Sequence, residues 1–262
     1  MTILDKIITT KKEGILHQKK QVGIKVLENA PLFGRQCNSL KENLLLEGAS
    51  GIIAEFKQKS PSKGIINNHS NVEEVTIGYR IAGASGLSVL TDNEYFGGSL
   101  DNLVKARSAN PLIPILRKDF MIDPYQIMEA KAHGADVILL IAACLEKNQL
   151  YSLAEVAKGL GMEVLVEVHN EEELQKLNPF VDMVGVNNRN LKTFEVSIEK
   201  SQQLEPLIPG EFVKISESGL SNPESIKILR NAGFRGFLIG ETFMKTEDPS
   251  KACKDFILSI PK

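Results

Sequence analysis

The 262-residue sequence predicts an α/β fold in which short strands alternate with helices along the chain. Eight short, apolar, β-branched runs recur, with polar turn residues and helical patterns between them. Near-continuous hydrophobicity is typical of parallel strands that are covered on both faces. Repeated β-α units at intervals of roughly 20–35 residues favour a (βα)8 TIM barrel. An open, doubly wound sheet is the alternative, because a strand count does not prove closure.

Local signals place the individual elements. The predicted helices each follow a residue that can cap a helix N-terminus, and two of them begin with proline. Three of them end beside a glycine, which readily adopts the left-handed cap. The predicted strands are residues 51–57, 86–92, 113–118, 136–141, 163–168, 181–187, 211–216 and 236–240, and the predicted helices are 72–82, 124–133, 171–177 and 223–232.

A further segment precedes the first predicted strand. Four apolar residues between Ile3 and Ile8 share one helical face, and residues 19–28 are predicted to form a second helix. We therefore expect one (βα)8-barrel domain over residues 1–262, with residues 1–48 as an N-terminal helical extension. The extension is either an extra helix packed on the barrel or a lid that faces the substrate, and the sequence leaves both open.

Composition excludes several classes of protein. A formal net charge of −2 argues against nucleic-acid binding, and the N-terminal segment has neither the pattern of a signal peptide nor that of a membrane span. Cys37, Cys144 and Cys253 are scattered, so we expect no disulfide framework, no metal site and a reducing, cytoplasmic compartment. No Walker A motif and no GxGxxG follows a strand, which argues against nucleotide hydrolysis and a dinucleotide cofactor.

Active sites of such barrels lie at the carboxyl ends of the strands. In the first predicted strand, Glu55 and Lys57 share a face with Ile53. That face must be the lumen or its mouth, because an outward charge would lie under the helix layer. The pair can pass a proton to a ligand, or it can be a structural ion pair that closes the top of the barrel.

The third and fifth strands also end in charged residues. One of Arg117 and Lys118 must point inward, because adjacent strand residues alternate. Glu167 lies on the lumenal face of the fifth strand, where a carboxylate is costly unless a cation such as Lys118 or Lys57 pairs with it. We interpret His169 as a helix-start or loop residue in preference to a general base.

The last three strands add polar and anion-binding groups. Asn187 offers an uncharged donor and acceptor at the mouth, and Arg189 can reach an anionic group. Gly219 and Gly240 permit close backbone approach in the loops where such barrels usually bind phosphate. Counting Glu217, we expect two lysines, three carboxylates, an asparagine and a phosphate-binding site at the carboxyl ends of the strands.

These residues stand in runs that resemble the indole-3-glycerol-phosphate synthase family of the tryptophan pathway. The segment AEFKQKSPS followed by RKDF is highly specific for that family. The similar runs are IIAEFKQKSPSKG at 52–64, ILRKDF at 115–120, LVEVH at 165–169, GVNNRNL at 185–191, SESGL at 216–220 and FLIGETFM at 237–244.

The resemblance implies a phosphosugar substrate and a lyase reaction. The substrate would be 1-(2-carboxyphenylamino)-1-deoxyribulose 5-phosphate, and the products would be indole-3-glycerol phosphate, carbon dioxide and water. No metal or organic cofactor is expected. Lys118 would be the general acid in ring closure, Glu167 would act in dehydration as base or charge stabiliser, and Asn187 would orient the substrate hydroxyls. Lys57 would pair with the substrate carboxylate and donate a proton in dehydration, and Glu55 would hold Lys57.

The resemblance also implies the binding residues. Glu217 would lie near the substrate nitrogen, and Phe96 and Phe120 would be walls for the aromatic ring.

We expect Lys57 and partial burial to lower the pKa of Lys118 toward neutrality, which suits a general acid.

The phosphate would lie among Ser60, Ser218, Gly219 and Gly240. Glu241 stands where the family usually has a small residue. Since a carboxylate repels phosphate, we expect only the backbone N–H of Glu241 to contribute.

Two other functions stay open at this point. A phosphoribosylanthranilate isomerase resembles this chain in its phosphate site, but it carries a strand-one cysteine and a strand-six aspartate, where this chain has Glu55, Lys57 and Asn187. A barrel that binds phosphosugars without turnover is the other alternative, and it differs from an enzyme in forming no product.

Overall fold

The computed structural model describes residues 2–190 and 193–261, and within them eight strands form one sheet. Seven of these strands lie inside the predicted runs, and the strand that ends at Glu217 extends one residue beyond its run. The strands are β1 (Ile52–Phe56), β4 (Gly86–Leu90), β5 (Ile115–Lys118), β6 (Val137–Ile141), β7 (Glu163–Val168), β8 (Met183–Asn187), β9 (Val213–Glu217) and β10 (Gly236–Ile239).

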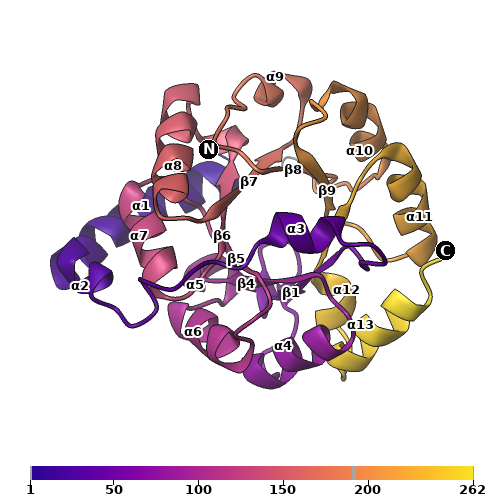
Figure 1. Ribbon diagram of the computed structural model, residues 1–262, viewed down its shortest axis with the longest axis horizontal. Coiled ribbons are helices and arrows are strands. Elements are labelled where there is room, and N and C mark those ends of the chain that lie inside the picture. Colours follow the sequence, from indigo (N-terminus) through magenta and orange to yellow (C-terminus); the bar gives the residue numbers. More distant parts are fainter. Residues whose placement is uncertain (1, 191–192, 262) are drawn as a thin grey trace.

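The sheet is a closed, parallel barrel. Its strand order is β1-β10-β9-β8-β7-β6-β5-β4, and β1 pairs with both β10 and β4. The TIM barrel is therefore confirmed, and the open-sheet alternative is wrong. Figure 1 looks along the barrel and shows the helices arranged around it. After β1, the short strands β2 (Lys59–Ser60) and β3 (Gly64–Ile65) form an antiparallel hairpin.

Alternation along the strands separates two apolar cores. Ile53 belongs to the cluster inside the barrel, with Leu116 and Leu165. Ala54 and Phe56 belong to the cluster between the barrel and the helices, as the period of two predicts. The lumenal face of β1, with Glu55 and Lys57, is thus the face that the sequence indicated.

The outer helices begin where the sequence predicts. Asn71, Asp123, Asn170 and Asn222 each accept a backbone N–H of the helix that follows, which satisfies donors that have no partner inside the helix. One predicted end is wrong, because α9 ends at Leu174 and not at residue 177. The helices after β1 are α4 (Val72–Ile81), α5 (Asn93–Phe96), α6 (Leu100–Ala109), α7 (Pro124–Ala132), α8 (Lys147–Gly159), α9 (Glu171–Leu174), α10 (Glu199–Leu204), α11 (Pro223–Ala232), α12 (Glu241–Met244) and α13 (Pro249–Leu258), with 3₁₀ turns η1 (Ala142–Cys144) and η2 (Glu205–Leu207).

The segment before β1 forms α1 (Ile3–Gln21), α2 (Ile24–Glu28) and α3 (Leu40–Leu45). The predicted helix over 19–28 is wrong, because α1 continues to Gln21 and α2 begins only after Gly23. Val22 has an extended backbone, and Gly23 is the N-cap of α2. A β-branched residue and a glycine both have low helix propensity, so the helix is interrupted there.

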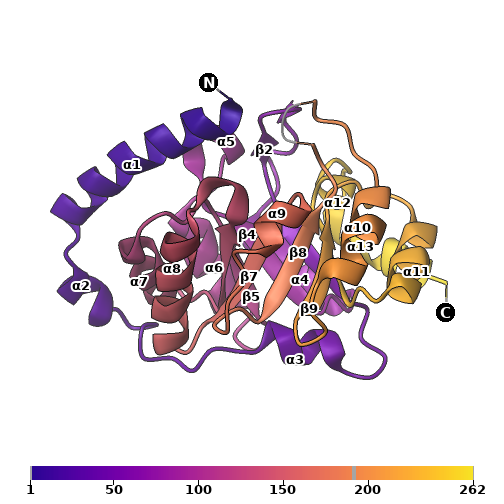
Figure 2. The ribbon, with the colours of Figure 1, turned by 90° about the horizontal axis from the view of Figure 1, so that it is seen from above.

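α3 closes the amino end of the barrel. Leu40 and Leu44 belong to the lumenal cluster, and the Glu163 carboxylate accepts the backbone N–H groups of Leu40 and Lys41 at 2.8 and 3.0 Å. Figure 2 shows α3 and α1 at opposite ends of the barrel. The open end is thus the one formed by the carboxyl ends of the strands.

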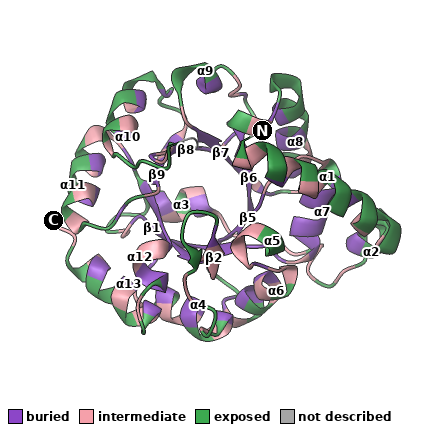
Figure 3. Ribbon diagram, turned by 180° about the vertical axis from the view of Figure 1, so that it is seen from behind, coloured by how far each residue is buried: buried purple, intermediate pink, exposed green. Residues whose placement is uncertain are grey.

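α1 lies at that open end, along the side of the barrel formed by α7 and α8, as Figure 3 shows from behind. Ile15 packs in a small cluster with Tyr125 of α7. Lys11 forms ion pairs with Asp92 at 2.9 Å and with Asp119 at 2.6 Å. Among the described helices, none is long and apolar enough to cross a membrane.

Candidate active site

A cavity of about 490 Å³ opens at the carboxyl ends of the strands. The structure brings all the predicted site residues together around it, although they come from seven of the eight β-α units. These residues are Glu55, Lys57, Ser60, Phe96, Lys118, Phe120, Glu167, Asn187, Arg189, Glu217, Ser218, Gly219, Gly240 and Glu241. The similar run at 185–191 ends on Leu191, which lies outside the described residues.

Lys118, at the end of β5, lies between two carboxylates. Its Nζ is 2.5 Å from Glu217 Oε2 and 3.1 Å from Glu167 Oε2. Burial disfavours the ammonium, but the charges of Glu217 and Glu167 outweigh burial and raise the pKa of Lys118. The expectation of a lowered pKa is therefore wrong. Its supposed cause was Lys57, which instead pairs with Glu55 at 3.1 Å.

Arg117, the neighbour of Lys118, points outward and is buried beneath α7. Its guanidinium pairs with Glu129 at 2.8 Å and with Asp119 at 3.1 Å. An outward charge can thus lie under the helix layer when it is paired, although the sequence argument for strand one assumed that it could not. Alternation then requires Lys118 to point inward.

Glu167, on β7, is held on both oxygens. Asn187 Nδ2 donates to Oε1 at 2.9 Å, and Lys118 donates to Oε2. Burial would raise the pKa of Glu167, but Lys118, His169 and the hydrogen bond from Asn187 outweigh it and lower the pKa. Glu167 is therefore an ionised carboxylate at neutral pH.

Glu217, on β9, has the opposite character. Burial, with the negative charges of Glu167 and Glu55, outweighs Lys118 and raises the pKa of Glu217 to about 7. Its Oε1 is buried and accepts no hydrogen bond from the described residues. A buried acceptor without a partner is costly, so this oxygen is suited to a donor on a ligand.

Gly185 and Gly240 make room for the carboxylates of the site. The sequence did not assign this role to either of them. A Cβ at Gly185 would overlap Glu217 Oε1, and a Cβ at Gly240 would lie 2.5 Å from Glu55 Oε1. Gly185 was visible as a lumenal residue of the sixth strand. Its role was not visible, because the clash comes from a neighbouring strand.

The loops after β1, β9 and β10 form the other end of the cavity. Ser60 is buried, and its Oγ has no hydrogen-bond partner among the described residues. Ser218 and Gly219 both have positive φ, at 69° and 73°, and such a backbone is strained for serine. Arg189 Nη2 lies 3.8 Å from Glu241 Oε2, so the predicted anion-binding arginine faces a carboxylate of the same rim.

Apolar side chains complete the walls. The rings of Phe96 and Phe120 lie 5.9 Å apart between centroids. The cavity is also lined by Ile3, Leu4 and Ile7 of α1. The N-terminal extension thus both packs on the barrel and faces the cavity. The apolar stripe of α1 was visible in the sequence, but the surface that it meets was not.

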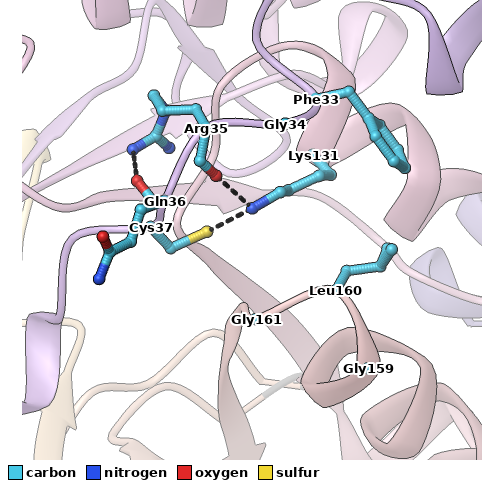
Figure 4. A pocket seen from close by; sticks show the side chains of 9 residues that line it. All are labelled: Phe33, Gly34, Arg35, Gln36, Cys37, Lys131, Gly159, Leu160 and Gly161. Atoms are coloured by element: carbon cyan, nitrogen blue, oxygen red, sulfur yellow. Dashed lines mark hydrogen bonds between the residues drawn. The ribbon is translucent and has the colours of Figure 1, made fainter.

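A second cavity, of about 510 Å³, lies at the amino end of the barrel (Figure 4). Its two basic side chains already have protein partners. Lys131 donates to Arg35 O at 2.7 Å and lies 3.1 Å from Cys37 Sγ, and Arg35 pairs with Asp136 at 2.6 Å. This cavity therefore marks where the segment before α3 is fastened to the barrel.

The fold and the site define an enzyme class: a (βα)8 barrel with lysine and glutamate side chains gathered at the carboxyl ends of its strands. In the part of the chain that is described, no group of three or more His, Cys, Asp or Glu side chains is arranged to hold a metal ion.

Comparison with known proteins identifies the family. A family model described as indole-3-glycerol phosphate synthase matches residues 4–256. An indole-3-glycerol phosphate synthase of Bacteroides thetaiotaomicron is 48% identical over 260 residues, covering 98% of each chain. One of Polynucleobacter asymbioticus is 43% identical over 262 residues, covering 97% of this chain and 98% of its own. The chain belongs to the indole-3-glycerol phosphate synthase family.

Solved structures show the same barrel at low identity. The 3-hexulose-6-phosphate synthase from Salmonella typhimurium aligns with a TM-score of 0.62 and 12% identity, covering 80% of this chain and 99% of its own. A chain of the tryptophan synthase complex from Pyrococcus furiosus aligns with a TM-score of 0.57 and 14% identity, covering 81% and 97%. At this identity, the likeness is one of fold alone.

Proposed function

We propose that the chain converts 1-(2-carboxyphenylamino)-1-deoxyribulose 5-phosphate to indole-3-glycerol phosphate, carbon dioxide and water. The observation that carries this proposal is Lys118, charged and half-buried between Glu167 and Glu217 in a cavity whose rim is suited to an anion. The reaction is that of a carbon–carbon lyase, and the three scattered cysteines favour a reducing compartment such as the cytoplasm.

Ring closure is assigned to Lys118. The aromatic carbon that bears the carboxylate attacks the sugar carbonyl, and Lys118 gives its proton to the carbonyl oxygen as the new carbon–carbon bond forms. The raised pKa keeps Lys118 in the acid form, which this step requires. Glu167 and Glu217 stabilise that charge and hold the ammonium in place.

The later steps are assigned to Lys57 and Glu167. Loss of carbon dioxide returns the ring electrons to the aromatic system. Lys57 then gives a proton to the departing hydroxyl, and Glu167 accepts the ring proton or stabilises the charge that develops. Before decarboxylation, Lys57 pairs with the substrate carboxylate, while Glu55, 3.1 Å away, holds it. Asn187 orients the sugar hydroxyls.

Two buried oxygens that have no hydrogen-bond partner among the described residues support the placement of the substrate. The substrate's secondary amine is a donor, and the free Oε1 of Glu217 is a buried acceptor. The phosphate needs donors, and Ser60 Oγ is a buried hydroxyl without a partner. The remaining phosphate contacts are assigned to Arg189 and to the backbone of Ser218, Gly219, Gly240 and Glu241. Phe96 and Phe120 are assigned to the aromatic ring.

One assay tests the proposal. The chain contains no tryptophan, so indole fluorescence on incubation with the substrate arises from product without a background from protein indole groups. We expect a steady rise that depends on enzyme concentration, with one carbon dioxide released per indole formed. Substrate that binds without any fluorescence or gas release would show a phosphosugar-binding barrel in place of an enzyme.

A further inference from the structure

His169 lies directly after β7, behind Glu167, and it is absent from the residues that line the cavity. Its side chain is 8% exposed. Nε2 lies 3.3 Å from Glu167 Oε1, and Nδ1 lies 3.2 Å from Glu173 Oε2. The ring is thus a bridge between a carboxylate of the site and a carboxylate outside it. This goes beyond the loop or helix-start role that the sequence suggested.

The outer end of this bridge is rigidly held. Glu173, in α9, accepts the backbone N–H of His169 at 2.7 Å with the same oxygen that faces the ring. Its other oxygen accepts Asn170 Nδ2 at 3.1 Å. Both oxygens of the Glu173 carboxylate therefore hold the loop between β7 and α9 or the His169 ring in place. Glu173 is itself buried.

The surroundings of the ring make it a cation. Burial disfavours the charged imidazole, but Glu167 and Glu173 outweigh burial and raise the pKa of His169 to about 9. Lys118 faces Glu167 from β5, and Lys176 follows α9. Cys144 of η1 lies near Glu167 and Glu173, and burial raises the pKa of its thiol to about 12. Near pH 9 the thiol is therefore neutral.

His169 also differs from the other partners of Glu167. Lys118 and Asn187 both line the cavity, so the substrate competes for them. His169 does not line it, so its hold on Glu167 persists when the cavity is filled. Its Nε2 has no aligned hydrogen bond among the described residues, so the contact with Glu167 is an ion pair at 3.3 Å.

We propose that His169 is a positioning residue: as an imidazolium between Glu173 and Glu167, it keeps Glu167 ionised and oriented while Lys118 and Asn187 engage the substrate. The inference rests on the proposed function, because Glu167 is the residue through which His169 acts. Without the charge of His169, Glu167 is left with Lys118 and Asn187 as partners, and the substrate competes for both of them.

A histidine titration tests the bridge without any turnover. The chain has four histidines, so the His169 ring can be assigned by its loss from the NMR spectrum of His169→Gln. We expect one ring to titrate near pH 9, and its pKa to fall by at least about one unit in both Glu167→Gln and Glu173→Gln. An ordinary pKa in the wild type, or no response to Glu167→Gln, would overturn the bridge.

The dependence of kcat on pH tests the positioning. We expect His169→Gln to lower kcat at least about tenfold with KM changed less than about threefold. We expect kcat of the wild type to fall at alkaline pH, where His169 loses its proton. In Glu173→Gln, which can still accept the His169 backbone N–H, His169 has lost one stabilising charge, so we expect this fall to move to lower pH. His133→Gln is the matched control, because His133 caps α7 and its ring Nδ1 lies 2.7 Å from the backbone oxygen of Glu129, away from the residues that line the cavity.

The outcomes separate the two proposals. Wild-type protein without turnover contradicts the proposed function, and the titration still decides the bridge. Wild-type turnover with a kcat of His169→Gln within twofold of normal, and with unmoved profiles, overturns the positioning role alone. If His169→Gln does not fold, the profile of Glu173→Gln decides between the same two results.

Discussion

At the scale of single residues, the protonation states follow from which charges are neighbours. Lys118 and Glu167 lie 3.1 Å apart and stabilise each other's charge, whereas burial, with the negative charges of Glu167 and Glu55, raises the pKa of Glu217. Pairs of titratable groups whose pKa values are pushed apart are typical of active sites. The acid and the base of the proposed reaction are thus distinguished by their partners and not by residue type.

Replacement of Lys118 by methionine should abolish turnover. The variant keeps the length of the side chain but has no proton to give, and positioned proton transfer is typically worth about 10²–10⁴-fold in rate. Glu217, whose pKa is already about 7, can take up a proton and relieve the repulsion from Glu167. We expect affinity for indole-3-glycerol phosphate, measured by its fluorescence, to stay within about tenfold.

Lys158→Met is the control, because Lys158 pairs with Asp182 on the outer surface, 2.8 Å away. It should turn over normally. A Lys118→Met variant with wild-type kcat would remove Lys118 from the role of general acid.

Replacement of Glu241 by serine should tighten substrate binding. The Glu241 carboxylate lies 3.8 Å from Arg189 and beside the proposed phosphate position, so it both competes with the phosphate and repels it. We expect KM to fall about three- to tenfold at low ionic strength, less at high salt, and kcat to stay unchanged. Steady-state kinetics on this variant and on the exposed Glu224→Ser control test it, and a higher KM would show that the carboxylate supports the site.

At the scale of elements, α1 and α3 close opposite ends of one barrel by different means. α3 inserts leucines into the lumen, whereas α1 is tied by Lys11 to Asp92 and Asp119 and covers the cavity with its first turns. The two ends should therefore respond differently to substitution.

Leu40→Ala should destabilise the barrel without changing its chemistry. Leu40 is fully buried in the floor of the lumen, and loss of such a side chain costs about 2–4 kcal/mol. Leu45, in the same helix, is 54% exposed, so Leu45→Ala should change the free energy of unfolding by less than about 0.5 kcal/mol. Urea unfolding measures both, and kcat at low temperature should match the wild type. Equal effects of the two substitutions would contradict the assignment of α3 as the floor.

At the scale of the whole molecule, acid should weaken the attachment of α1 to the barrel. Burial would raise the pKa of Asp119, but Lys11 and Arg117 outweigh it and lower the pKa to about 2. The unfolded value is about 3.9, so Asp119 contributes about 2 kcal/mol at neutral pH. This contribution is complete above about pH 5 and is lost as the pH falls through 2.

Lys11→Met should therefore lower the free energy of unfolding at pH 7 and change it much less near pH 2. Urea unfolding at both pH values measures the difference, and hydrogen exchange in α1 should rise in the variant at pH 7. A pH-independent difference would mean that Lys11 stabilises α1 through its hydrocarbon stem and not through Asp119.

Much of the site was readable from the sequence because strand alternation is local. The period of two placed Glu55 and Lys57 in the lumen, and it required one of Arg117 and Lys118 to face inward. Helix starts were also readable, since a capping side chain bonds to the backbone two or three residues away. The wrong helix over 19–28 failed at Val22 and Gly23, where weak local preferences left the boundary undetermined.

By itself, the sequence determined the eight strands, the faces of their side chains and the residues gathered at one end. Only the tertiary structure decided that the sheet closes, that Lys118 lies between Glu167 and Glu217, that its pKa rises, and that α1 covers the cavity. The reason is physical. Alternation and capping act over a few residues, whereas closure, Coulomb interactions and burial depend on distances between segments that are far apart in the chain.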